Sequence, residues 1–233
     1  MTLFASSHKQ PLRLALFDFD GTLCDSAEQI VGAIKKAGND IGLTNIQDEQ
    51  ARQSIGQGLH HFALKLTNND NAKANEFFDA YKRNFRAQVD SGGIYVSPLF
   101  EGAQEAVISL VEDGWFTGIV TNKGRAGLNY LLQTHGIGHL FDLTFTVDEK
   151  QPKPSPEMII DAVNDCGVEL SNTVLIGDTI YDAQCASNAG ISFVGVGWGY
   201  NSAEMLIQYG ARMIVNDFSQ LNIILSEIIS KNI

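Results

Sequence analysis

Six short runs of apolar residues recur along the chain, each rich in β-branched or aromatic side chains. Nearly every position in these runs is apolar, a pattern typical of parallel strands buried on both faces. The pattern therefore predicts six strands, within residues 12–19, 115–122, 142–147, 172–178, 191–197 and 211–217.

Apolar residues at helical spacing lie between most of these runs. Alternation of strands and helices is typical of a doubly wound α/β domain, in which a parallel sheet carries helices on both faces. The sequence predicts such a Rossmann-like core, with helices near residues 101–113, 125–135, 156–167, 180–189, 202–209 and 218–230.

Residues 26–93 interrupt this alternation, because the segment holds helical patterns and no convincing strand. We interpret it as a helical domain inserted after the first strand, with the α/β core formed by residues 1–25 and 94–233. The insertion would sit over the carboxyl end of that strand, where open α/β sheets bind ligands. Ser26 and Gln29 fit a capping box that starts its first helix, and Gly92 and Gly93 fit a hinge.

The acidic composition argues against nucleic acids and anionic membranes as partners. Lys and Arg total 16 against 27 Asp and Glu, giving a formal net charge of -11. The number of cysteines is odd, at three, and none of them form a CxxC motif, which favours a reducing compartment. With no signal-like start and no membrane-length apolar run, the cytoplasm is the expected location.

Polar residues follow four of the predicted strands or their loops. Asp18 and Asp20 follow the first strand, and alternation in an extended strand would send both to one face. Carboxylates about 4 Å apart repel by roughly 4 kcal/mol at an effective dielectric near 20, so a divalent cation is expected to offset them. The other polar positions are Thr121, Asn122, Lys153, Asp178 and Asp182.

Phosphoryl transfer is the chemistry that fits these residue types. Mg²⁺ prefers a few carboxylates together with water and a substrate phosphate, and Asp18 and Asp178 can meet if their strands are neighbours. A carboxylate can attack phosphorus while a second acid, such as Asp20, moves the proton. Thr121 and Lys153 can stabilise charge on the transferring group.

The motifs "DFDGT" at 18–22, "TN" at 121–122, "KP" at 153–154 and "GDTIYD" at 177–182 occur in the order of the haloacid dehalogenase superfamily, which the sequence resembles. The insertion resembles this family's C1-type cap. The resemblance implies that Asp18 is the nucleophile and Asp20 the general acid and base. Asp18, Asp178 and the Asp20 backbone carbonyl would bind Mg²⁺, and Asp182 would orient the metal surroundings or Lys153. Phosphate would be held by Thr121, Lys153 and backbone N–H groups near Gly21 and Asn122.

The substrate and some residue roles stay open at this stage. "DFDGTLCDS", "TNK" and "KPSPE" most resemble phosphoglycolate phosphatase, with pyrophosphate, nucleotide and sugar-phosphate phosphatases as alternatives. A phospho-Asp signalling domain and a non-catalytic homologue are more remote hypotheses. Asp182 could equally cap a helix that starts after Thr179. Candidates for substrate contact are Gly56, Gln57, His60 and Arg125, and the protein is expected to act as a monomer or homodimer on a small phosphorylated metabolite.

Overall fold

The structure of the protein is a computed structural model that describes residues 11–56, 59–90 and 96–231. Its centre is a six-stranded, wholly parallel sheet in the order β3-β2-β1-β4-β5-β6. The strands are β1 (Leu14–Phe17), β2 (Phe116–Thr121), β3 (Leu143–Thr146), β4 (Thr173–Gly177), β5 (Ser192–Val196) and β6 (Met213–Val215). Each lies within one of the predicted apolar runs, so the predicted doubly wound core is confirmed.

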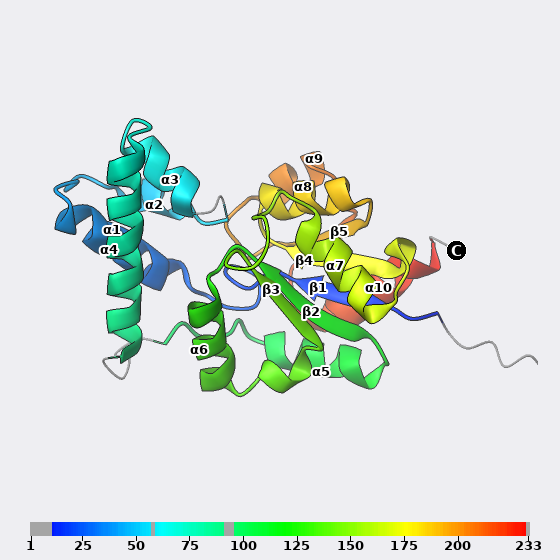
Figure 1. Ribbon diagram of the computed structural model, residues 1–233. Helices are drawn as coiled ribbons and strands as arrows, with labels where there is room; N and C mark the ends of the chain where they lie inside the picture. Colours follow the sequence, from blue (N-terminus) through cyan, green and yellow to red (C-terminus); the bar gives the residue numbers. More distant parts are fainter. Residues whose placement is uncertain (1–10, 57–58, 91–95, 232–233) are drawn as a thin grey trace, which may run out of the picture.

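Helices cover both faces of the sheet (Figure 1). One face packs against α5 (Ala103–Glu112), α6 (Arg125–His135) and α10 (Leu221–Ser230). The other packs against α7 (Glu157–Cys166), α8 (Ile180–Ala189) and α9 (Ala203–Gln208). Strand β1 is apolar at every position because both of its faces are buried. Ala15 and Phe17 face the first group of helices, and Leu14 and Leu16 face the second.

The strand order places a topological switch at β1. The chain builds β2 and β3 to one side of β1 and then returns to build β4, β5 and β6 on the other. Ligands of open α/β sheets bind at the carboxyl ends of strands at such a point. Because β1 pairs with both β2 and β4, residues that follow these three strands gather at one edge.

Four further helices form a group beside the sheet, at the left of Figure 1: α1 (Ala27–Asp40), α2 (Asp48–Arg52), α3 (Leu59–Leu66) and α4 (Asn71–Asp90). They bury an apolar cluster of their own, centred on residues such as Ile34, Phe62 and Phe77. Within the described part of 26–93 there is no strand, although the exact limits of the inserted domain stay a prediction. Gly92 and Gly93, the predicted hinge, lie outside the described residues.

The predicted capping box at Ser26 is wrong. The hydroxyl makes no capping bond to α1 and donates instead to Asp20 Oδ1 at 2.7 Å, while Gln29 accepts a hydrogen bond from Ser97. The Ser26 hydroxyl is turned toward the charged Asp20 carboxylate, and a hydrogen bond to an ionised acceptor is stronger than one between neutral groups such as a cap.

None of the helices in the described ranges combines the length and the apolar character needed to cross a membrane.

Candidate active site

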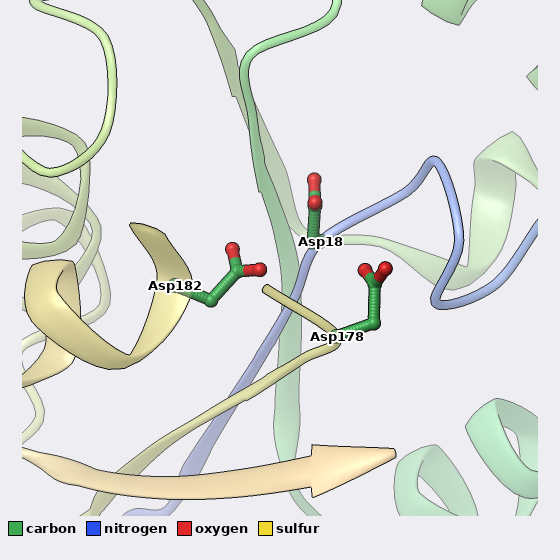
Figure 2. A group of neighbouring side chains, drawn as sticks. All are labelled: Asp18, Asp178 and Asp182. Atoms are coloured by element: carbon green, nitrogen blue, oxygen red, sulfur yellow. The ribbon is translucent and has the colours of Figure 1, made fainter. Parts of the chain in front are cut away.

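Three buried carboxylates lie together at the switch edge of the sheet. Asp18 follows β1, Asp178 follows β4, and Asp182 lies in the first turn of α8 (Figure 2). One oxygen of each lies within 4.8 Å of the others, and all three side chains are buried. The sequence prediction that Asp18 and Asp178 meet through neighbouring strands is confirmed by the β1–β4 pairing.

Lys153 is the cation of this cluster. Its Nζ lies 2.9 Å from Asp18 Oδ1 and 2.5 Å from Asp182 Oδ1, and only 1% of its side chain is exposed. A buried ammonium is costly without partners, and the two carboxylates supply them. A lysine that sequence alone could assign to a solvated loop is therefore built into the site.

Burial and mutual repulsion shape the titration of these groups. Burial raises the pKa of Asp18 to about 6, although Lys153 and the Thr121 hydroxyl act in the opposite direction. Burial, together with the charges of Asp182 and Asp18, holds the pKa of Asp178 well above its ordinary value. Burial opposes the charge on Lys153, but Asp18 and Asp182 outweigh it and its pKa lies above the usual range.

The donor set fits a hard divalent cation. Three carboxylates against one ammonium leave this cluster with a formal charge of −2 (−3 + 1) when all are ionised. Carboxylate oxygens clustered in this way are the ligands that Mg²⁺ prefers. A bound divalent cation would offset both the excess charge and the cost of burial.

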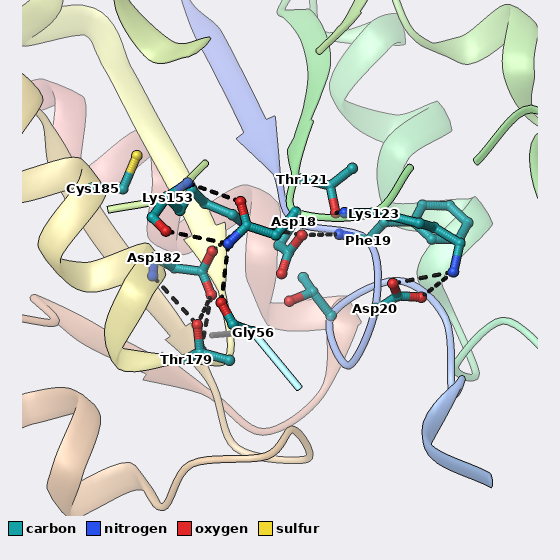
Figure 3. A network of polar contacts seen from close by, with 12 residues as sticks. Asp18, Phe19, Asp20, Gly56, Thr121, Lys123, Lys153, Thr179, Asp182 and Cys185 are labelled. Atoms are coloured by element: carbon teal, nitrogen blue, oxygen red, sulfur yellow. Dashed lines mark hydrogen bonds and ion pairs between the residues drawn. The ribbon is translucent and has the colours of Figure 1, made fainter. Parts of the chain in front are cut away.

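Asp18 and Asp20 both lie beyond the end of β1 at Phe17, so strand alternation does not by itself place their side chains. The Asp20 carboxylate lies between the Ser26 hydroxyl and Lys123, whose Nζ is 2.9 Å from Oδ1 and 3.1 Å from Oδ2. Each of the two acids thus has a lysine partner, Lys153 for Asp18 and Lys123 for Asp20, and the expected contribution of a divalent cation stays a prediction. Figure 3 shows Asp18 between the Lys153–Asp182 pair and the Asp20–Lys123 pair.

The turn after β1 brings Gly21 against Asp178. Gly21 has φ +83°, and a Cβ there would lie 2.4 Å from Asp178 Oδ2, so only glycine fits. Its N–H is donated to the Cys24 carbonyl at 2.9 Å. The N–H of Gly21 itself is therefore paired within the turn, and phosphate binding by backbone N–H groups near Gly21 stays a prediction.

Thr121 ends β2 beside the cluster, and Asn122 follows it. The Asn122 side chain accepts from the Lys153 N–H at 2.8 Å and donates to the Lys153 and Gly56 carbonyls at 3.2 and 3.0 Å. The Asn122 side chain thus holds the Lys153 loop, and phosphate binding by the backbone N–H near Asn122 stays a prediction. Thr121 Oγ1 accepts from the Lys123 N–H at 3.2 Å, with its side chain buried next to Asp18.

Asp182 has both of the roles that the sequence left open. Thr179 and Asp182 form a capping box at the start of α8, with Asp182 Oδ2 accepting from the Thr179 N–H at 2.9 Å. The other oxygen, Oδ1, pairs with Lys153. One carboxylate therefore fixes both the helix end and the buried ammonium.

The four candidates for substrate contact differ in their position relative to the site. Gly56 approaches the site, since its carbonyl meets Asn122 and a Cβ there would lie 2.6 Å from the Thr179 side chain. Arg125 is wrong as a candidate, because its guanidinium is bound to Glu149 and Thr144. His60 is exposed and packs edge-to-face on Phe78 within the helical group. Gln57 lies outside the described residues.

Sequence reasoning missed three residues at this edge: Lys123, Ser26 and Tyr200. The Tyr200 N–H donates to Asp178 Oδ2 at 3.0 Å, and its ring packs against Gly21 and the apolar cluster of α1–α4. Lys123 carried one signal, its place directly after the Thr-Asn pair at a strand end. Its partner Asp20 is 103 residues away, and no local pattern reveals that pairing.

Comparison with known proteins identifies the family. The model of haloacid dehalogenase-like hydrolases matches residues 15–196. The chain therefore belongs to the haloacid dehalogenase-like hydrolase family, and it is an enzyme of that family.

Relatives of known name match over nearly the whole chain. A protein named probable phosphatase IndB, from Dickeya dadantii, is 31% identical, with 89% of this chain and 91% of that protein covered. A phosphoglycolate phosphatase from Colwellia psychrerythraea is 28% identical (91% and 96% covered), and pyrophosphatase PpaX from Bacillus velezensis is 29% identical (88% and 93%). Among solved structures, a predicted phosphatase from Clostridium acetobutylicum superposes with a TM-score of 0.83 at 25% identity, covering 93% of this chain and 99% of that one.

Proposed function

We propose that the protein is a Mg²⁺-dependent phosphatase that hydrolyses a small phosphomonoester through an aspartyl-phosphate on Asp18. The observation that carries this proposal is the buried group of Asp18, Asp178, Asp182 and Lys153 at the switch edge of the sheet. The names of the relatives support phosphate chemistry in general.

Two chemical steps follow from the residues. An oxygen of Asp18 attacks phosphorus, the bond from phosphorus to the leaving oxygen breaks, and Asp20 gives that oxygen a proton. Asp20 then takes a proton from water, which attacks the phosphorus of the aspartyl-phosphate and releases inorganic phosphate. Ser26 and Lys123 hold Asp20 in place for both steps.

The remaining groups bind and orient the phosphate. Thr121, Lys153 and the Asn122 N–H would receive its negative oxygens in a water-poor site. Asp18, Asp178 and the Asp20 backbone carbonyl would hold Mg²⁺, with Asp182 orienting Lys153. When bound, the ion would neutralise charge on the transferring phosphoryl group.

Phosphoglycolate is the proposed substrate, and pyrophosphate, nucleotide and sugar phosphates are the alternatives. The helical insertion at 26–93 would act as the cap that selects among them, with Gly56 at its contact with the core. We further propose that the protein is cytoplasmic, that it acts as a monomer or homodimer, and that it binds neither nucleic acids nor membranes.

A phosphate-release assay tests the mechanism. Wild type should release phosphate from an aryl phosphate and from phosphoglycolate only with Mg²⁺. Asp18→Asn should be inactive, while Asp165→Asn, at an exposed acid of α7, should behave as wild type. Equal turnover by wild type and Asp18→Asn would reject the mechanism. A long-lived phospho-Asp after treatment with a small phosphodonor, without turnover, would favour the signalling-domain hypothesis instead.

A further inference from the structure

Lys123 is a buried cation on the side of Asp18 away from Lys153 (Figure 3). It lies two residues beyond the end of β2, and only 6% of its side chain is exposed. Its ammonium donates to both oxygens of Asp20 at 2.9 and 3.1 Å. An ammonium has three N–H donors, so this pair leaves one for a further acceptor.

The position of Lys123 is fixed by its neighbours on the core and on α4. Its Nζ lies 5.2 Å from the centre of the Phe85 ring, and Tyr81 stacks on Phe85 at 6.1 Å. A Cβ at Gly127 would lie 3.2 Å from Lys123 Cε and 3.0 Å from Phe85, so the backbone of α6 closes against both side chains. The lysine is held at the contact between α4 and the core.

This position is next to the leaving group of the proposed reaction. Asp20 must lie within hydrogen-bond distance of the leaving oxygen to protonate it. The Lys123 ammonium is hydrogen-bonded to the same carboxylate. It therefore lies within roughly 6 Å of the leaving oxygen, which is the length of two hydrogen bonds placed end to end. A carboxylate or phosphate attached one or two bonds beyond the leaving oxygen can reach it.

We propose that Lys123 is a specificity-determining residue that binds an anionic group on the leaving group, so that the enzyme prefers substrates whose leaving group carries its own carboxylate or phosphate. This inference rests on the proposed function. The Lys123 ammonium, bordered by the Phe85 ring, keeps one N–H donor beyond its two bonds to Asp20, and a hydrogen bond from an ammonium to an anion is stronger than one to an uncharged polyol. Lys153 cannot take this role, because its charge is shared by Asp18 and Asp182 on the opposite side.

Matched substrates separate anion binding from a role in orienting Asp20. Phosphoglycolate and its amide have leaving groups of the same shape that differ in charge, and pyrophosphate provides a phosphate as the anion. Lys123→Met should lower kcat/KM about 100-fold for phosphoglycolate and pyrophosphate, and only several-fold for the amide, because charge-assisted hydrogen bonds are the strong ones. Lys123→Arg should recover part of the loss.

The control is Lys150→Met, which removes a partly exposed lysine paired with Asp161 and should leave all three values unchanged. As a second measurement, free glycolate should inhibit wild type at least ten-fold more strongly than Lys123→Met, and ethylene glycol should inhibit neither. An equal fractional loss for phosphoglycolate and its amide in Lys123→Met would overturn the inference, because Lys123 would then act through Asp20 alone. A selective loss with only one of the two anionic substrates would identify which anion it binds. Absence of phosphate release from every substrate, the amide included, would instead reject the proposed function.

Discussion

Asn122 and Lys153, 31 residues apart in the chain, are joined by two hydrogen bonds. The Asn122 Oδ1 accepts from the Lys153 N–H at 2.8 Å, and its Nδ2 donates to the Lys153 carbonyl at 3.2 Å. The same Nδ2 also reaches the Gly56 carbonyl, in the segment between α2 and α3. One amide therefore links the strand-end loop, the lysine loop and the helical insertion.

Asn122→Ala should lower both activity and stability. Without the amide, the Lys153 N–H loses its acceptor, so the loop that holds the ammonium loosens. We expect kcat to fall about ten-fold and the free energy of unfolding by about 1–3 kcal/mol, measured by phosphate release and urea unfolding. Asn188→Ala is the matched control, because its amide donates to Pro154 in the same loop but at an exposed position. If the two variants lost activity and stability equally, the hydrogen bonds from Asn122 would matter no more to the Lys153 loop than the exposed one from Asn188.

Lys153→Met should be among the most damaging single substitutions in the core. It leaves the buried carboxylates of Asp18 and Asp182 without their cation, and removing one partner of a buried pair costs about 3–5 kcal/mol. We expect a kcat at least about 100-fold below wild type, since a charge-stabilising donor is also lost. Lys150→Met, from the preceding part of the loop, removes only a partly exposed pair and should cost about 1 kcal/mol or less. Thermal unfolding of the two variants side by side checks the difference.

Ser26→Ala should lower turnover but should not destabilise the helix that follows, α1. The hydroxyl makes no bond to α1 and instead holds Asp20, so kcat should fall several-fold without loss of helix content. Ser202 provides the contrast, because its hydroxyl does cap α9 by accepting from the Met205 N–H. Ser202→Ala should cost about 1 kcal/mol of stability and leave kcat unchanged. Circular dichroism and phosphate release measure both effects, and a helix loss in Ser26→Ala would contradict the assignment.

The features that sequence predicted well are those with a local signal. Buried parallel strands are apolar at successive positions, as β1 shows, and the site residues that follow β1, β2 and β4 were predictable because strand ends converge at a sheet edge. The capping box of Thr179 and Asp182 is also local, and the structure contains it.

The errors arose where a residue had two possible partners or a distant one. Ser26 fits a helix cap by spacing, yet the nearby charge of Asp20 takes its hydroxyl. Arg125 follows the Thr-Asn-Lys segment and could have faced substrate, but Glu149 and Thr144 satisfy its guanidinium. The pairing of Lys123 with Asp20 exists only in three dimensions, because it needs β1 and β2 to be neighbours.

The stability of the protein should depend jointly on pH and Mg²⁺. In the metal-free fold the pKa of Asp18 is about 6 against an ordinary 3.8, and that of Asp178 is also raised. The folded state then binds more protons than the unfolded state above pH 4, so the contribution of these two groups to stability falls as pH rises through that window. Mg²⁺ binds their charged forms, so its stabilising effect should grow over the same range.

Asp178→Asn separates this effect from the rest of the titration. Wild type with Mg²⁺ at about 100 times its Kd at pH 7.5 should gain about 2.7 kcal/mol there, or roughly 5–10 °C in Tm, and clearly less at the same Mg²⁺ concentration near pH 5, where Mg²⁺ competes with protons. Asp178→Asn should lose that gain. Without Mg²⁺ it should unfold a few degrees higher than wild type near pH 7.5, because burial raises the pKa of Asp178, so folding must either bury its charge or bind a proton, and asparagine does neither. Thr22 and the Tyr200 N–H still find partners in the amide. Asp165→Asn should keep the wild-type response to Mg²⁺. A gain that is the same at both pH values, or that survives in Asp178→Asn, would place the cation at a different site.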